Sequence, residues 1–383
     1  MASSATLEVL DRLIAFDSVS RNSNLDVIDW ARGLLEGSGA ATRTSLNPER
    51  TKANLFATWG QGEGGLVLSG HTDVVPVDGQ DWRSDPFRAD IRDGRLYGRG
   101  ACDMKGFVAI AMARAMAAGA TASGRPLHVA LSYDEEMGCL GIPVLIADLQ
   151  ASGLRPAACL VGEPTLMEVV SAHKGGRLYR CRVRGHAAHS SLAPQAVNAI
   201  EYGARVIGFV QDIAARFRDQ GPFDHEFDVA HGTISTNLAS GGNGSNIVPA
   251  RFEFMFEHRF LPGADPEGPI REITERVARD LLPRMREVDP EANITFEPIG
   301  AIPALAVPEQ AAILAHGRAL AGGGPVRKVA YGTEASFFQE AGIDTIVCGP
   351  GSIAQAHKAD EYVELDQLAR CESFVDRLIL ALA

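Results

Sequence analysis

Apolar residues in the first part of the chain follow helical and strand-like patterns in turn. Residues 7–16 and 27–35 place apolar side chains at helical spacing, whereas residues 54–59 and 66–69 are short apolar runs followed by glycine. Such runs are typical of buried strands. The alternation continues with a helix from Asp103 to about residue 118, a strand at 127–133, a helix at 142–149 and a strand at 158–162. This succession predicts an α/β sheet with helices on its faces.

The pattern changes near Lys174. Residues 177–184 alternate as a half-buried strand does. The elements predicted next are a long helix, two strands and an amphipathic helix at 197–217, 232–239, 252–260 and 270–285. From Ala292 the α/β pattern returns, with a strand at 346–348 and a closing helix at 365–383. We therefore predict a discontinuous domain of residues 1–173 and 291–383, interrupted by an α+β module of residues 174–290.

Composition and charge restrict the function. Hydrophobic residues make up 46% of the chain and charged residues 22%, as in an ordinary globular protein. With 36 Lys+Arg against 48 Asp+Glu, the net charge of −12 disfavours nucleic acid and anionic membranes as partners, because both need a basic surface. The six cysteines form no Cys-x-x-Cys pair, and the first residues lack a signal-peptide pattern. We expect free thiols, a soluble cytoplasmic protein and no membrane segment.

Residues able to bind metal ions or move protons stand at five predicted strand ends or helix starts. They are His71 with Asp73, Asp103, the Asp134-Glu135-Glu136 run, Glu163 and His357. Each alone has a structural explanation, such as a helix N-cap for Asp103 or a solvated acidic turn for Glu135 and Glu136. Because the carboxyl ends of strands gather at one edge of an open α/β sheet, a shared site explains the whole set better.

The types of side chain in this set indicate the chemistry. Imidazoles and carboxylates without a thiolate suit Zn²⁺, Co²⁺ or Mn²⁺. The set exceeds what one tetrahedral ion needs, but it suffices for two ions that share a bridging carboxylate. Two such ions lower the pKa of a bridging water and polarise a carbonyl group. The spare carboxylate of the Glu135–Glu136 pair would then serve as general base.

The motifs around these residues resemble the acetylornithine deacetylase / succinyl-diaminopimelate desuccinylase / aminoacylase family of co-catalytic metallohydrolases, over essentially the whole chain. The matching segments are His71-Thr72-Asp73-Val74-Val75-Pro76, Gly98-Arg99-Gly100, Asp103-Met104-Lys105-Gly106, Asp134-Glu135-Glu136-Met137-Gly138, Gly162-Glu163-Pro164-Thr165 and the loop around His357. The resemblance implies a zinc-exopeptidase-like mixed sheet flanked by helices, with an inserted ferredoxin-like lid or dimerisation domain. It also implies a homodimer formed through that domain.

The resemblance further implies roles for the catalytic residues. The ligands of one metal ion would be His71, Asp103 and Glu163. The ligands of the other would be Asp103, Glu136 and His357. Asp103 would therefore bridge two ions, which we expect to be Zn²⁺ or Co²⁺. Asp73 would support His71, Glu135 would be the general base, and the peptide bond after Asp103 would be cis.

Three residues of the predicted insert match positions that contact substrate in this family. His189 would reach the active site of the partner subunit and stabilise the oxyanion, with His186 as the second choice. Asn246 would contact the substrate. Arg259 would hold the α-carboxylate, because a guanidinium group binds a carboxylate at two points. Without the resemblance, a salt bridge at the strand end would explain Arg259 equally well.

Motifs near the C-terminus are similar to the acetylornithine deacetylase branch of the family. They are Tyr331-Gly332-Thr333-Glu334-Ala335 and the segment from Gly349 to Tyr362. We therefore expect deacetylation of N2-acetyl-L-ornithine, a step of arginine biosynthesis, with Thr333 and Glu334 lining the substrate pocket and Glu334 facing the δ-ammonium group. The alternatives are deacylation of another N-acyl amino acid, desuccinylation of succinyl-diaminopimelate, peptidase activity, and a non-catalytic binding protein on the same fold.

Overall fold

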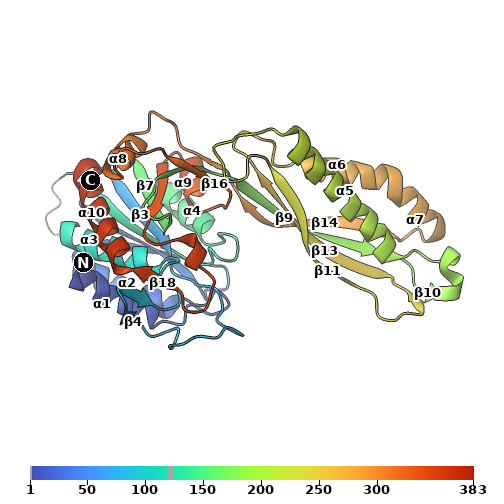
Figure 1. The fold of residues 1–383 in the computed structure, drawn as a ribbon, viewed down its shortest axis with the longest axis horizontal. Helices are drawn as coiled ribbons and strands as arrows, with labels where there is room; N and C mark the ends of the chain where they lie inside the picture. The colour runs from blue at the N-terminus through green and yellow to red at the C-terminus, as the bar shows by residue number, and fades with distance from the viewer. Residues whose placement is uncertain (1, 120–123) are drawn as a thin grey trace. The chain divides into compact units, whose positions relative to one another are not determined.

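The computed structural model describes residues 2–119 and 124–383. The chain divides into two units: the first comprises Met1–Ala172, Leu305–Lys328 and Thr333–Ala383, and the second His173–Ala304 and Val329–Gly332. The sequence pattern places the end of the insert at residue 290, whereas the second unit continues through Ala304. Both units appear in Figure 1.

Nine strands form the main sheet, which belongs to the first unit. They are β1 (Ala41–Leu46), β2 (Ala53–Trp59), β3 (Leu66–His71), β6 (Leu127–Ser132), β7 (Ala158–Pro164), β8 (Val170–His173), β15 (Leu305–Ala306), β16 (Arg327–Val329) and β17 (Asp344–Gly349). The order is β1-β2-β6-β3-β7-β17-β8-β15, and β16 pairs with β8. Strands β6, β3, β7 and β17 run parallel to one another, whereas β1 and β2 are antiparallel. The expected mixed sheet is thus confirmed.

The helices of the first unit pack around this sheet (Figure 1). They are α1 (Ser4–Ile14), α2 (Leu25–Gly37), α3 (Lys105–Gly119), α4 (Ile142–Ser152), α8 (Ala312–Leu320), α9 (Ala335–Glu340), α10 (Leu365–Leu382) and the short 3₁₀ helix η3 (Ile353–Gln355). A small sheet of β4 (Asp90–Arg92), β5 (Arg95–Tyr97) and β18 (Tyr362–Glu364) completes the unit. None of the helices in residues 2–119 and 124–383 is long and apolar enough to cross a membrane.

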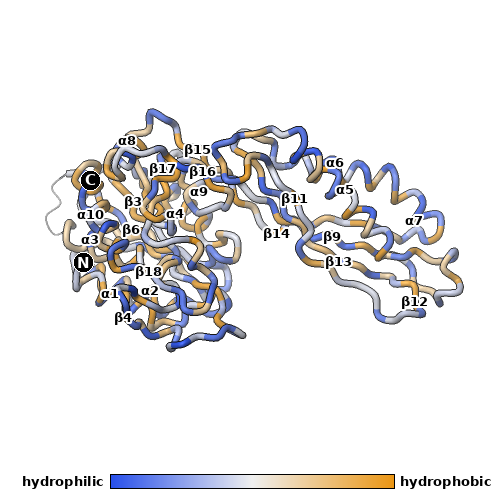
Figure 2. The backbone as a smooth tube through the Cα atoms, in the orientation of Figure 1, coloured by the Kyte–Doolittle hydropathy of each residue, from blue (hydrophilic) through white to orange (hydrophobic). Residues whose placement is uncertain are grey.

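Helix α3 is buried over most of its length because its sequence is apolar around the whole circumference. Its Phe107 packs on Gly162 of β7, where a Cβ atom would lie 1.8 Å from the Phe107 ring. A glycine at this position therefore allows the helix to approach the strand. Figure 2 shows hydrophobic residues concentrated along the central strands β3, β6 and β17. The start of α3, which follows Asp103, is thereby held close to the sheet.

The second unit is an α+β module with one antiparallel sheet. Its elements are β9 (Gly175–Arg184), β10 (Ala188–His189), η1 (Ser190–Gln195), α5 (Ala199–Gln220), β11 (Thr233–Gly241), β12 (Ile247–Val248), β13 (Arg251–Phe260), α6 (Gly268–Arg276), η2 (Val277–Leu281), α7 (Leu282–Val288) and β14 (Asn293–Ile302). The sheet order is β11-β13-β9-β14. Phe254 and Phe256 of β13 join Val206 and Val210 of α5 in the core of this unit.

Two sequence expectations for this module need correction. Strand β14 belongs to the module and not to the returning α/β domain, because it pairs along β9 from Asn293 opposite Arg184 to Ile302 opposite Gly176. The module is therefore a complete βαββαβ unit. The single helix predicted at 270–285 is instead α6, a π-helical turn (η2) and α7. Pro283 lies in the first turn of α7, where its missing N–H interrupts the regular hydrogen-bond ladder.

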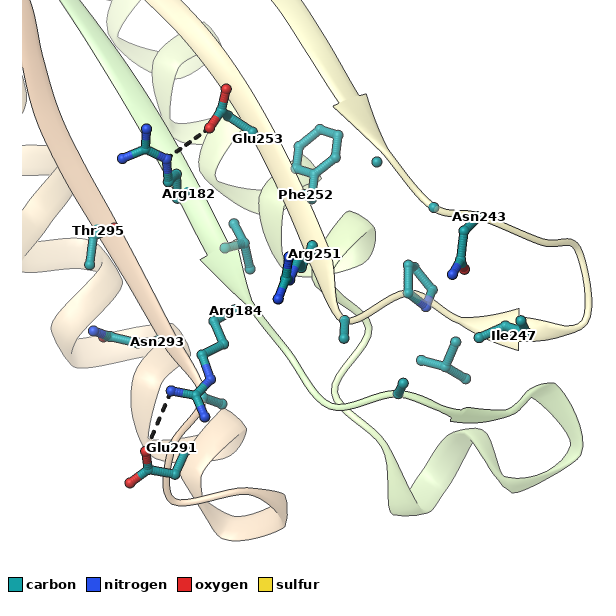
Figure 3. A pocket seen from close by; sticks show the side chains of 18 of the residues that line it. Arg182, Arg184, Asn243, Ile247, Arg251, Phe252, Glu253, Glu291, Asn293 and Thr295 are labelled. Carbon is teal, nitrogen blue, oxygen red and sulfur yellow. Dashed lines mark hydrogen bonds and ion pairs between the residues drawn. The ribbon is translucent and has the colours of Figure 1, made fainter.

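A broad cavity of about 1170 Å³ lies on the second unit, over the ends of β9, β13 and β14 (Figure 3). Arg182, Arg184 and Arg251 line it, together with Glu253 and Glu291. Arg182 pairs with Glu253, and Arg184 pairs with Glu291 (Figure 3). None of the residues predicted to bind metal or substrate lines this cavity.

Candidate metal centre and active site

Neighbouring parallel strands bring the predicted residues to one edge of the main sheet. His71 is the last residue of β3 and lies opposite Ser132, the last residue of β6. The acidic run Asp134–Glu136 begins two residues after the end of β6, and Glu163 lies near the end of β7, which pairs with β3. Because these strands run parallel, their carboxyl ends meet, as the sequence predicts.

The first group of possible metal ligands is His71, Asp103 and Glu163, all buried. The Nε2 atom of His71 lies 3.2 Å from Oδ1 of Asp103 and 3.9 Å from Oε1 of Glu163. Among the described residues, Glu163 Oε1 has no hydrogen-bond partner although it is buried. A buried carboxylate oxygen without a hydrogen-bond donor is expected of a metal ligand, because a cation would take the place of the donor.

The second group consists of Asp103, Glu136 and His357. His357 Nε2 lies 3.4 Å from Oδ2 of Asp103 and 3.0 Å from Oε2 of Glu136. The two oxygens of Asp103 therefore face different groups, Oδ1 the first and Oδ2 the second. The side chain of His357 is 52% exposed, so this group lies at the solvent side of the site. The geometry brings the five expected ligands together as two groups that share one carboxylate.

Asp103 reaches this position from the loop that precedes α3. The Asp103–Met104 peptide bond is cis, as the resemblance implies. The backbone N–H of Asp103 donates to Oε1 of Glu361 at 3.0 Å. Burial by itself would raise the pKa of Asp103. Hydrogen bonds from His357 and His71 outweigh this effect, and the net pKa lies below the ordinary value of an aspartate. Asp103 is thus held as a carboxylate between two imidazoles.

Asp73 links His71 to the acidic turn after β6. Nδ1 of His71 lies 2.9 Å from the Asp73 carbonyl oxygen and 3.6 Å from Oδ1 of Asp73. The backbone N–H groups of Glu135 and Glu136 donate to the same carboxylate at 3.1 and 3.3 Å. Asp73 can therefore fix the tautomer and orientation of His71, leaving Nε2 for a metal ion.

The two carboxylates that follow Asp134 are strongly affected by burial. Burial raises the pKa of Glu135 to about 8, although nearby His71 opposes the shift. Burial also raises the pKa of Glu136, and His357 partly offsets this. Burial raises the pKa of Glu163 as well, with the charge of Asp103 adding to the shift. So many buried carboxyl groups are costly without cations among them, which fits a site built for divalent ions.

The Thr-Glu pair at 333–334 stands at the start of α9. Thr333 is buried, and its hydroxyl accepts a hydrogen bond from the Ala335 N–H at 3.2 Å. Glu334 is fully buried, and neither of its carboxylate oxygens has a hydrogen-bond partner among the described residues. Burial raises the pKa of Glu334 to about 7, while the nearby Ser132 hydroxyl opposes the shift. Glu334 is thus a buried carboxyl group that accepts no well-formed hydrogen bond from the described residues, although the Ser132 hydroxyl lies near enough to lower its pKa.

The remaining predicted residues belong to the second unit. His189 ends β10 and is exposed, with Nδ1 2.8 Å from the Ser191 hydroxyl. His186, the second choice, pairs with Asp289 at 3.1 Å. Asn246 is exposed, and its backbone carbonyl oxygen accepts a hydrogen bond from the Ser190 N–H at 2.9 Å. Their substrate roles stay predictions.

Arg259, on β13 of the same unit, is half-buried, and its guanidinium lies 2.6 Å from a carboxylate oxygen of Glu257. This salt bridge by itself accounts for an arginine at this position, without any role in substrate binding. Holding the substrate carboxylate would require Arg259 to leave or share this partner, and that role also stays a prediction.

Sequence reasoning missed several residues that contact the site. The Ser20 hydroxyl donates to Oδ2 of Asp73 at 2.7 Å, and Lys52 forms an ion pair with Asp134. Neither Ser20 nor Lys52 lies in a recognisable motif, so no local signal could have identified them. Glu361 stands inside the C-terminal motif, but its contacts with the Asp103 loop appear only in the folded chain.

Comparison with known proteins decides the family. Residues 67–381 match the pattern of peptidase family M20/M25/M40. The chain belongs to this family. It is 33% identical over 376 residues to an acetylornithine deacetylase of Myxococcus xanthus, covering 97% of this chain and 95% of that protein. It is 32% identical to an acetylornithine deacetylase of Pasteurella multocida, covering 97% of each chain.

Solved structures of M20 relatives share the fold. A tripeptidase from Staphylococcus aureus superposes with a TM-score of 0.76 at 19% identity, covering 99% of this chain and 98% of that one. A dinuclear metal-binding peptidase of the M20 family from Bacillus subtilis gives 0.69 at 13% identity, with 98% and 97% coverage. Membership of the M20 family, together with the deacetylase relatives, supports a metal-dependent amidohydrolase.

Proposed function

We propose that this M20 enzyme removes the acetyl group from N2-acetyl-L-ornithine, releasing L-ornithine and acetate. The observation that carries the proposal is the pair of ligand groups that share Asp103, with the buried carboxyl of Glu135 beside them. The deacetylase relatives, aligned over almost the whole chain, supply the substrate. We assign the reaction to arginine biosynthesis on the same basis.

The residues present fit two divalent metal ions, for which we propose Zn²⁺ or Co²⁺. His71, Asp103 and Glu163 would hold one ion, and Asp103, Glu136 and His357 the other. Imidazole and carboxylate donors without a thiolate suit these ions. When bound, the ions would lower the pKa of a water molecule and polarise the acetyl carbonyl group.

Glu135 is the proposed general base and acid. Burial raises the pKa of Glu135, and the positive charge of bound divalent ions would lower it again, so that the side chain could accept and return a proton near neutral pH. Glu135 accepts a proton from the attacking water, and the tetrahedral intermediate then collapses. Glu135 returns the proton to the leaving α-amino group, and ornithine and acetate depart. Asp73 keeps His71 in the tautomer that presents Nε2 to the site.

Substrate recognition is proposed for residues of both units. Glu334, buried and without a donor, would accept the δ-ammonium group of acetylornithine, and Thr333 would line the same pocket. Arg259 would bind the α-carboxylate, and Asn246 would contact the substrate. We further propose that the second unit serves as a lid and dimerisation domain. In the homodimer, His189 would stabilise the oxyanion in the partner subunit's site.

The experiment that tests this function is hydrolysis of N2-acetyl-L-ornithine by the purified protein. We expect turnover that a chelator abolishes and that Zn²⁺ or Co²⁺ restores. We also expect kcat/KM for acetylornithine to exceed the values for succinyl-diaminopimelate and acetyl-methionine. A metal-dependent preference for either of those compounds would keep the site and discard the substrate. Metal binding with no turnover on any of them would instead favour a non-catalytic binding protein.

A further inference from the structure

A buried ion pair lies directly behind the shared ligand Asp103. Arg99 and Glu361 have side chains that are 0% and 1% exposed, and Nη1 of Arg99 lies 2.7 Å from Oε2 of Glu361. Arg99 belongs to the loop that leads to Asp103, and Glu361 follows the loop that carries His357. The pair therefore joins two loops that each supply a possible ligand of the second group.

The carboxylate of Glu361 accepts four hydrogen bonds, two at each oxygen. The N–H groups of Cys102 and Asp103 donate to Oε1 at 2.9 and 3.0 Å. The Gly100 N–H and the Arg99 guanidinium donate to Oε2 at 3.0 and 2.7 Å. Three backbone N–H groups of the loop, those of Gly100, Cys102 and Asp103, are thus fixed by one side chain. An amide could not replace it, because its NH₂ group would face two donors at either position.

Arg99 continues the connection to the His357 loop. Its Nη1 also donates to the Lys358 carbonyl oxygen at 3.3 Å, and its Nη2 donates to Oε1 of Gln80 at 2.5 Å. The amide of Gln80 in turn donates to the His357 carbonyl oxygen at 3.1 Å. We call Gln80, Arg99 and Glu361 the loop clamp. It contacts the backbone of both loops, the one that leads to Asp103 and the one that carries His357.

We infer that the loop clamp positions Asp103 and His357 for the second metal ion and thereby sets the affinity of that ion. This inference rests on the proposed function, because it requires two metal ions. Glu361 and Arg99 do not reach the reacting atoms and are positioning residues. Contacts of this kind, behind the direct ligands, typically change metal affinity by about 10- to 100-fold.

The two ligand groups depend on the clamp to different degrees. In the first group, His71 and Glu163 belong to strands β3 and β7, whose hydrogen-bonded ladder fixes them without the clamp. In the second group, His357 lies in a loop with a half-exposed side chain, and its backbone contacts run through Gln80. Loss of the clamp should therefore weaken the second ion much more than the first.

The test uses calorimetric titration of the metal-free full-length protein with Zn²⁺. The variants are Glu361→Gln, which places donor against donor, and Gln80→Ala, which removes the contacts of Gln80 with the His357 carbonyl and with Arg99 but leaves the four hydrogen bonds of Glu361 in place. Glu372→Gln is the matched control, because Glu372 is also a buried carboxylate with several donors, from Ser3 and Thr6, at helices α1 and α10. Circular dichroism and thermal unfolding monitor the fold of each variant.

We expect two binding events in the wild type and in Glu372→Gln. In Glu361→Gln the weaker event should lose at least about tenfold in affinity while the tighter event changes less than about threefold. Gln80→Ala should show the same selectivity with a smaller loss. If Glu361→Gln does not fold, Gln80→Ala decides, because Gln80 is only half-buried at the surface.

Three outcomes overturn the inference. Unchanged affinities in folded Glu361→Gln or Gln80→Ala mean that the clamp does not position ligands. An equal loss of Zn²⁺ affinity at both sites, in proportion to a fall in thermal stability like that of the Glu372→Gln control, means that the pair only stabilises the fold. A wild-type protein that binds fewer than two ions overturns the proposed function and this inference together, whereas the other two outcomes leave the proposed function intact.

Discussion

The two units use the same charged residue types in opposite ways. In the first unit, Arg99 and Glu361 form an ion pair that is almost fully buried, and Glu334 is buried without any donor among the described residues. In the second unit, Arg182 and Glu253 pair with side chains 51% and 41% exposed, on the face of the sheet shown in Figure 3. Exposed pairs of this kind contribute about 0–1 kcal/mol, whereas breaking a buried pair costs about 3–5 kcal/mol.

This difference shows where the chain accepts an electrostatic cost. Burying Glu135, Glu163 and Glu334 together is unfavourable unless a cation or a substrate ammonium group compensates. The exposed ladder of Arg182 between Glu253 and Glu297 needs no such compensation, because water solvates each charge. Buried carboxyl groups with an unpaired oxygen, such as Glu163 and Glu334, therefore indicate chemistry in the first unit, while exposed ones in the second indicate only a solvated surface.

The sharpest way to break this comparison is to replace Glu135, the proposed general base. We expect Glu135→Gln to lower kcat for acetylornithine by about 10²- to 10⁴-fold, because the amide cannot accept the proton of the attacking water. Metal content should stay near that of the wild type. Glu253→Gln in the second unit is the control and should leave kcat unchanged. Loss of a metal ion from Glu135→Gln would reassign this residue to the ligands.

The second prediction concerns a buried histidine in each unit. Burial lowers the pKa of His128 in β6 and of His258 in β13 to about 4, from the ordinary histidine value of 6.5. Below pH 6.5 these histidines are protonated in the unfolded chain but stay neutral in the folded chain. The free energy of unfolding therefore falls as pH falls. Each histidine should cost about 2 kcal/mol of unfolding free energy between pH 7 and pH 5.

Urea unfolding of the metal-free protein at both pH values measures this effect. The variants His128→Gln and His258→Gln should each lose about 2 kcal/mol less than the wild type over this interval. Because each variant is compared with itself at the two pH values, the part of its stability change that does not depend on pH cancels. An identical loss in wild type and variant would show that the imidazole is protonated in the folded unit after all.

The smallest expected effect tests the role proposed for the unpartnered carboxyl group. Glu334→Gln should lower kcat/KM for acetylornithine by about tenfold, because a charge-assisted hydrogen bond to the δ-ammonium group becomes a neutral one. Acetyl-methionine, which lacks that ammonium group, should be hydrolysed as before. Glu297→Gln in the exposed ladder provides the matched control. An unchanged kcat/KM for acetylornithine would eliminate Glu334 as a specificity residue.

Much of the first unit could be predicted from local sequence. Strands such as β3 and β17 are short apolar runs bounded by polar or glycine-rich segments, and such runs are visible without a structure. The residues that end them, including His71 and Glu163, followed from the rule that ligands gather at the carboxyl ends of parallel strands. The family followed from the motifs around these residues and is confirmed by the match over residues 67–381.

Other features depend on pairings that no local pattern reveals. The sequence of strand β14 alternates too weakly to assign it to a domain, and its membership is decided by its long pairing with β9. The π-helical turn before Pro283 likewise interrupts a helix that the apolar spacing predicts as continuous.

The sequence by itself determined which residue types could bind metal ions, where strands end and which family the chain belongs to, because these are properties of short segments. Only the tertiary structure decided that Glu334 is buried without a donor and that Glu361 fixes the loop of Asp103. Both are contacts or missing contacts between residues far apart in the chain, including a separation of 258 positions for Glu361 and Asp103. Burial and hydrogen-bond satisfaction arise only when the chain is packed, so they are absent from any local pattern.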